Sequence, residues 1–164
     1  MIFEPTFREA GAGSAGFSAT GYNYFTVDFA ANGLGGGIGQ GKIAVYPVPG
    51  QIGITPIFLN NQEEPDPVPS QKNGVGYPVS VHADINVAVN VTSFTIQPRG
   101  GLPLQTRLLS RMGNAQNPGD TETPASAAAI VPLTVLSPST TYDVQFVGTV
   151  SGQPVSFNWS FTTR

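Results

Sequence analysis

The clearest alternation of apolar and polar residues lies at the end of the chain. Tyr142, Val144 and Phe146 share one side of a predicted strand, and across Val155–Phe161 the odd positions are apolar while the even ones are Ser or Asn. Successive side chains of a strand point to opposite faces, so both runs predict strands with one buried and one solvated face. The turn-like sequence Val150–Gln153 between them predicts an antiparallel hairpin.

The preceding segment carries several weaker strand patterns. Three valines at alternate positions end at Val91, and Phe94 and Ile96 continue on the opposite parity. This change of parity predicts a bulge, turn or strand break across Thr92–Ser93. Further strands are expected in three stretches: Tyr77–Val81, Leu104–Leu109 and Ala127–Val135. Strands at this spacing predict a β-sandwich over residues 76–164.

The first 75 residues divide into two segments. Residues 1–50 contain strand-like stretches at Tyr22–Phe29 and Lys42–Val48, separated by the glycine-rich Ala31–Gly41. That run lacks the features of a nucleotide-binding loop, which favours a flexible connection between strands. Residues 51–75 form a predicted connector because Asn60–Gln71 has prolines at three alternate positions. Three acidic side chains of this connector offer oxygen ligands for Ca²⁺, but a solvated linker is the favoured explanation: Glu63, Glu64 and Asp66.

The composition also favours an all-β fold, and it argues against some classes of binding partner. Of 164 residues, 20 are Gly and 15 are Pro, which disfavours long helices, and only 10% are charged. The net charge is −3, and the basic residues are too scattered to follow a row of phosphates, which argues against nucleic-acid binding: Arg8, Lys42, Lys72, Arg99, Arg107, Arg111 and Arg164. There is no cysteine, so neither disulfides nor thiolate metal sites are expected.

Export signals and membrane spans are not evident in the sequence. No apolar run approaches the length of a membrane-spanning helix. The stretch Met1–Ala10 carries three charged residues where a signal peptide would need an apolar region, so a signal would have to lie upstream.

Candidate catalytic residues are sparse. His82 is the single histidine, and Asp84 follows two positions later, so the pair would share one side of a strand. No nucleophile-elbow sequence accompanies them, which favours a solvent-facing pair at a strand end over a triad. The remaining acids show no spacing typical of paired-carboxylate hydrolases: Glu4, Glu9, Asp28, Asp66, Asp120, Glu122 and Asp143. One histidine without cysteine also disfavours zinc. We therefore predict no catalytic, cofactor-binding or metal site, and no enzyme.

Two further patterns have a simple structural explanation. Trp159 could offer a stacking platform for a sugar, but its phase with Phe157 and Phe161 favours the core. The glycosylation patterns Asn90–Thr92 and Asn158–Ser160 fall within predicted strands and are not expected to be used.

The C-terminal motifs resemble those of bacterial immunoglobulin-like domains. Leu136–Tyr142 has the form Leu-x-Pro-x-Thr-x-Tyr before the penultimate strand, and Trp159–Thr163 has the form Trp-x-Phe-Thr-Thr at the last. The resemblance is good over roughly the last 30 residues and looser over Tyr77–Ile96. It implies an antiparallel immunoglobulin-like sandwich over residues 76–164.

The first half is similar to a different family. Ile2–Pro5, Arg8–Gly13 and Tyr24–Phe29 resemble the closing strands of a CAP (SCP-like, cysteine-rich secretory protein) domain. Three motifs resemble the connector that joins such a domain to an immunoglobulin-like module in some bacterial secreted proteins: Val45–Gln51, Glu64–Pro67 and Val75–Val79. The cleft residues of the CAP family lie mostly upstream of this part, so none is carried over here.

The strand patterns and the two resemblances lead to three expectations of function. The first is a non-catalytic structural, adhesion or spacer module of an exported bacterial protein, located outside the cell or at its surface. The second is a self-assembling surface protein, in which open strand edges within residues 1–50 seek another chain. The third is an accessory domain of a cell-wall or glycan-acting enzyme. The expected partners are therefore other chains, the protein's own N-terminal domain or cell-wall glycan.

Overall fold

The computed structural model describes residues 41–84, 86–115 and 117–164, residue 38, and the backbone alone of residues 9–17 and 22–30. Every regular element of these residues except one short 3-10 turn is a β-strand, and the strands pair antiparallel. This confirms the predicted all-β, antiparallel class. The motifs at Ile2–Pro5, most of Ala31–Gly41, and the side chains of Glu9 and Asp28 lie outside the described residues.

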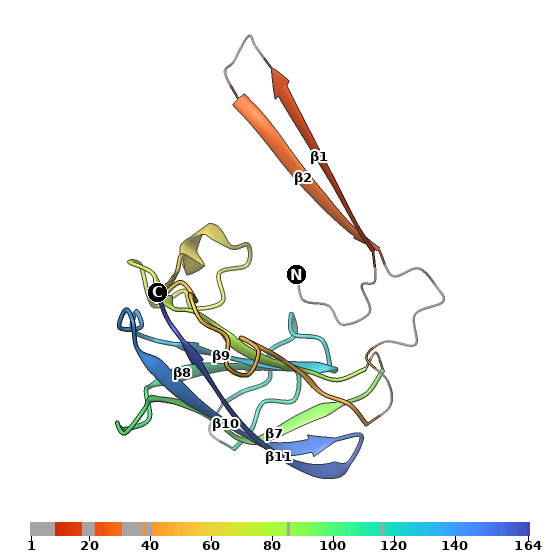
Figure 1. Cartoon of the computed structure of the whole chain (residues 1–164). Helices are drawn as coiled ribbons and strands as arrows, with labels where there is room; N and C mark the ends of the chain where they lie inside the picture. The colour runs from red at the N-terminus through yellow and green to blue at the C-terminus, as the bar shows by residue number, and fades with distance from the viewer. Residues whose placement is uncertain (1–8, 18–21, 31–37, 39–40, 85, 116) are drawn as a thin grey trace.

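Two sheets lie face to face and enclose the main core (Figure 1). The four-stranded sheet has the order β3-β6-β9-β8, with bounds β3 Ala44–Tyr46, β6 Val79–His82, β8 Thr106–Ser110 and β9 Ala127–Pro132. The three-stranded sheet has the order β11-β10-β7, with bounds β7 Val89–Pro98, β10 Thr141–Val150 and β11 Gln153–Thr162.

The remaining elements form smaller units. Among the described strands, β1 (Glu9–Phe17) and β2 (Tyr22–Ala30) pair only with each other, in a register that runs from Glu9 opposite Ala30 to Phe17 opposite Tyr22 (Figure 1). β4 (Ile57–Phe58) pairs with β5 (Val75–Gly76), and the 3-10 turn η1 covers Asn60–Gln62.

The predicted C-terminal hairpin is present, and its central strand supplies the middle of the core. Tyr142, Val144 and Phe146 of β10 are at most 2% exposed, as their alternation predicts. Trp159 of β11 is also buried, and its indole Nε1 donates to the carbonyl of Pro47 at 2.9 Å. Core packing is thus confirmed for Trp159 over a sugar-stacking role.

Phe157 is where the predicted buried face is wrong. Its side chain is 37% exposed, although Phe146 directly opposite it on β10 is fully buried. The difference arises because β10 is central whereas β11 is the edge of its sheet. The ring still contacts Trp159, with 5.5 Å between centroids.

The parity change in β7 is a β-bulge, as the sequence predicts. Ser93 pairs with Val147 and Val91 pairs with Gly148, so Thr92 is the extra residue between them. The strand continues on both sides, which lets Val91 and Phe94 both face the core despite their opposite parity.

Residues that precede position 76 also build the sandwich. β3 pairs with β6, and Ile54 is 4% exposed within the main core. After Pro47 the chain leaves the four-stranded sheet, and Gly50–Ile54 follows the end of β11 in a parallel direction. The sequence placed β3 in the N-terminal segment and Ile54 in the connector because no local pattern reveals such long-range pairing.

The corner between β9 and β10 is fastened by a hydroxyl. The Tyr142 hydroxyl accepts a hydrogen bond from the backbone N–H of Ser137 at 2.8 Å. Thr163 closes the same corner: its Oγ1 donates to the carbonyl of Ser137 at 2.7 Å and accepts from the N–H of Thr140 at 2.9 Å. The two C-terminal motifs therefore form one joint.

The proline-rich loop is organised around Asn60, which is completely buried. Its side-chain amide donates to the carboxylate of Asp66 and to the carbonyls of Val68 and Gln71, at 2.9–3.0 Å. Val68 is itself buried, in a small cluster with Val75 and Val131. This part of residues 51–75 is consequently a packed loop.

Candidate functional site

The outer face of the three-stranded sheet is almost wholly polar. The register places side chains in rows across the strands, because directly paired residues share a face. One row is Gln97, Asp143 and Ser160, and the next is Thr95, Gln145 and Asn158. These residues alternate with the buried ones on each strand, so the face follows from the same pattern that builds the core.

A shallow hollow of about 380 Å³ lies on this face. Its side chains come from adjacent positions of all three strands: Gln97, Asp143, Gln145, Asn158 and Ser160. The side chains of Gln97, Gln145 and Asn158 make no hydrogen bond to any other described residue, so their donors and acceptors are available to a ligand. The sequence did not predict this group of side chains, because only the pairing register shows which residues of the three strands are neighbours.

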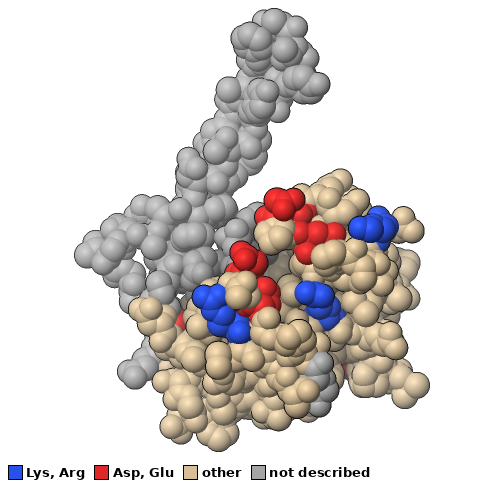
Figure 2. All heavy atoms as spheres, turned by 180° about the vertical axis from the view of Figure 1, so that it is seen from behind, with Lys and Arg blue, Asp and Glu red and all other residues tan. Residues whose placement is uncertain are grey.

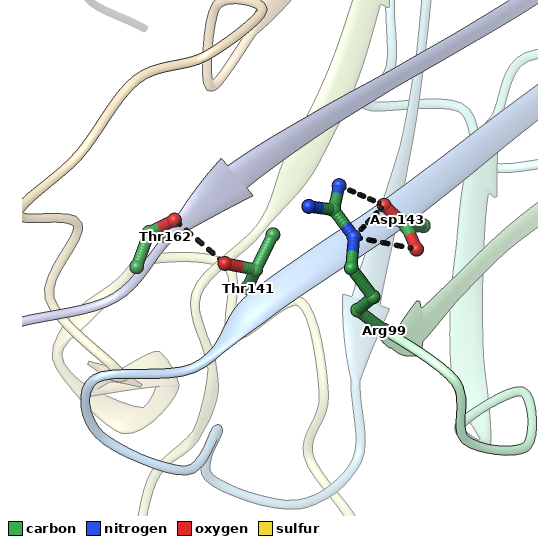
Figure 3. Close-up of polar contacts among 4 residues, drawn as sticks. All are labelled: Arg99, Thr141, Asp143 and Thr162. Atoms are coloured by element: carbon green, nitrogen blue, oxygen red, sulfur yellow. Dashed lines mark hydrogen bonds and ion pairs between the residues drawn. The ribbon is translucent and has the colours of Figure 1, made fainter.

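An ion pair borders the hollow. Arg99 binds Asp143 through two nitrogens: Nη2 lies 2.7 Å from Oδ1, and Nε lies 3.2 and 3.3 Å from the two carboxylate oxygens (Figure 3). The hydrogen bonds to Asp143 raise the pKa of Arg99. The Arg99 side chain is 61% exposed and that of Asp143 is 38% exposed, so the pair orients the carboxylate more than it stabilises the fold.

Next to the ion pair, two threonines bridge β10 and β11. The hydroxyls of Thr141 and Thr162 lie 3.0 Å apart (Figure 3). With Asp143 held by arginine, the face presents amides, hydroxyls and one neutralised carboxylate. Such groups can hydrogen-bond a neutral polar ligand.

His82 lies on the opposite sheet, and its predicted solvent exposure is wrong. It is only 6% exposed, and its Nε2 is 3.0 Å from Oγ of Ser80 on the same strand. A small cavity of about 150 Å³ adjoins the pair, floored by Ala127–Ala129 and bordered by Leu109 and Thr123. Thr123, which lines this cavity, belongs to the residues that follow β8. The alternate spacing of Ser80 and His82 was the available signal for this contact.

Within the described part of the chain, the acidic residues of the connector do not gather into a group of three His, Cys, Asp or Glu side chains that could hold a metal ion. Asp66 instead accepts hydrogen bonds from Asn60 and from the N–H of Val68. The bond from Asn60 is the largest cause of its lowered pKa, ahead of an opposing effect of burial. Asp66 therefore stabilises the proline-rich loop by accepting these hydrogen bonds.

One tyrosine has a strongly shifted pKa. Burial raises the pKa of Tyr77 to about 12, assisted by a hydrogen bond with Tyr46, whose ring centroid is 6.1 Å away. Tyr77 consequently remains protonated at neutral pH and cannot act there as a base.

The two glycosylation patterns lie within strands, as predicted. Asn90 is on β7 and donates to the hydroxyl of Thr149 at 3.2 Å, while Asn158 is on β11.

Charge is sparse and mixed in sign on the surface. Figure 2 shows acidic and basic side chains close together on one face, with a broad uncharged area beside them. No described segment is a helix long and apolar enough to cross a membrane.

No family model matches the chain, and no curated protein does.

Proposed function

We propose that this chain is a non-catalytic structural module of an exported bacterial protein, built on an immunoglobulin-like sandwich. Such a module would hold a neighbouring domain away from the cell surface. The N-terminal motifs that resemble the end of a CAP domain and its connector suggest what that neighbour is.

The observation that carries the proposal is the strand order, combined with the joint at Tyr142. Constant-type immunoglobulin domains have sheets A-B-E-D and C-F-G, and they carry a tyrosine at the start of strand F whose hydroxyl binds the backbone upstream. Lettering β3 and β6–β11 in chain order yields the same two sheets. Tyr142 is the second residue of the strand that would be F, and it binds Ser137. Many cell-surface proteins use this architecture.

Two assays test the absence of catalysis. The purified chain is incubated with short-chain ester substrates and with cell-wall glycan, alongside Ser80→Ala and the matched control Ser93→Ala. We expect no turnover above buffer by any of the three. Hydrolysis by the wild type that is lost only in Ser80→Ala would contradict the proposal and assign catalysis to the buried Ser80–His82 pair.

The hollow on the polar face favours a second candidate function, the binding of cell-wall glycan by an adhesion or accessory domain. Sugars present many hydroxyls, and the hollow offers side-chain amides that no described residue engages. Co-sedimentation with insoluble cell-wall glycan distinguishes the two candidates. A spacer stays in solution; an adhesion module sediments, and a Gln145→Ala, Asn158→Ala double variant returns to solution.

A further inference from the structure

Among the described residues, part of the β11 edge has no strand partner. β11 borders its sheet, and its outward backbone groups belong to even-numbered residues, as the bonds of Ser160 and Thr162 to Gly50–Ile54 show. That segment covers the strand from Ser160 onward. Ser156 and Asn158 point the same way, and no described residue pairs with their outward N–H and C=O groups. Open backbone groups at a sheet edge favour addition of another strand.

The uncovered window has a definite length. It begins at Gln153, directly after the tight turn at Ser151–Gly152, and it ends at Trp159, before Ser160 meets Gly50. Its central residue is Ser156, which is exposed. A strand of about the same length fits the window without displacing the segment that covers the rest of β11.

We infer that this window pairs with the same window of a second copy of the chain, antiparallel, about a two-fold axis at Ser156. An axis there places Ser156 opposite its own copy and Asn158 opposite Pro154 of the partner. A two-fold interface must be complementary to itself, and β11 qualifies because none of the residues Gln153–Thr162 is charged. Two copies therefore bring no like charges together.

The register also uses the exposed apolar side chains. Phe157, 37% exposed, falls opposite Val155 of the second copy, and Val155 is itself half-buried. Aromatic and β-branched residues form favourable cross-strand pairs. Pro154 lies outward at the end of the window, where the absence of its N–H costs one hydrogen bond per copy.

The contact is small, so association should be weak and transient. It extends the three-stranded sheet into a six-stranded one across two copies, and it leaves both polar outer faces on the same side. This inference is independent of the proposed function, since a spacer and a glycan-binding module would both carry the same edge.

The first experiment places a charged side chain at the proposed two-fold axis. Sedimentation equilibrium is measured up to about 1 mM protein for the wild type, Ser156→Lys, Ser156→Glu and the control Gln145→Lys, which changes an exposed residue of the same face away from the edge. We expect the wild type and the control to dimerise alike. Each Ser156 variant alone should have a dissociation constant at least tenfold higher, because like charges then meet at the axis.

An equimolar mixture of Ser156→Lys and Ser156→Glu should recover association, since opposite charges then face each other. A strictly monomeric wild type would overturn the inference, as would dimers that Ser156→Lys leaves unchanged. Weakening by each variant without recovery in the mixture would also overturn it, because the edge would then pair with a different segment, such as the β1–β2 hairpin of another copy.

A second measurement fixes the register. The chain has no cysteine, so Ser156→Cys introduces one thiol at the axis. Residues in a hydrogen-bonded antiparallel pair have Cα atoms about 5.5 Å apart, within the range of a disulfide. We expect Ser156→Cys to form disulfide dimers at least tenfold faster than Val135→Cys, whose position is 45% exposed and off the edge. Equal rates would overturn the register.

Discussion

At the scale of single residues, the joint at Tyr142 explains why two sequence motifs separated by more than fifteen residues belong together. The tyrosine of the first motif binds the backbone of Ser137, and Thr163 at the end of the second binds Ser137 and Thr140. The ring of Tyr142 also stacks on Phe161, with 5.8 Å between centroids. The two motifs thus form the joint at Tyr142, a set of hydrogen bonds directly beside the core.

We predict that Tyr142→Phe lowers the free energy of unfolding by about 1–3 kcal/mol, because the N–H of Ser137 loses its acceptor beside the core while ring packing is kept. Urea denaturation followed by tryptophan fluorescence measures the effect. Ser156→Ala, which removes an exposed hydroxyl, should change stability by less than about 0.5 kcal/mol. Equal effects of the two substitutions would show that the hydrogen bond from Ser137 to the Tyr142 hydroxyl contributes nothing to stability.

At the scale of elements, the bulge in β7 brings two backbones unusually close. A Cβ atom added at Gly148 would lie 2.1 Å from the carbonyl oxygen of Asn90, closer than atoms can approach. Glycine at this position is therefore required by space, since the strand pairs on both sides of Thr92.

Gly148→Ala should accordingly lower the free energy of unfolding by at least about 2 kcal/mol, as expected when a packed site is overfilled. Gly152→Ala is the matched control: its added Cβ meets nothing within 4 Å, and only its positive φ of 77° opposes the change. Thermal unfolding of both variants, followed by circular dichroism, compares the costs. A larger cost at Gly152 would mean that backbone conformation outweighs close contact here.

The elements differ in how far the sequence reveals them. The hairpin of β10 and β11 and the bulge were predictable because alternation records which face of a strand is buried. Phe157 was mispredicted since alternation reports the face of a strand and says nothing of whether the strand lies at the edge of its sheet. The hollow and the cavity at His82 could not be predicted, because each depends on register between strands distant in sequence.

At the scale of the whole molecule, the sandwich begins earlier than residue 76. β3 completes the four-stranded sheet and Ile54 fills the core, although both precede the predicted boundary. The predicted domain limits therefore need a direct experimental test.

Shortened chains provide that test. A chain that begins at Lys42 should retain the unfolding free energy of the full chain, because β1 and β2 pair with no other strand that the structure describes. A chain that begins at Ile57 should lose at least about 3 kcal/mol, since it lacks β3 and the buried Ile54. Denaturant midpoints measure both. Equal stability of the two shortened chains would restore the boundary at residue 76.

The parallel course of Gly50–Ile54 along β11 has a mechanical consequence. Four backbone hydrogen bonds of 2.8–3.2 Å join the two segments between Gly50 and Arg164. If tension enters through the chain before Gly50 and leaves through Arg164, the parallel segments are pulled in opposite directions along their length. The bonds are then loaded in shear, all at once, and cannot open one after another, so the proposed spacer would resist tension applied in this direction.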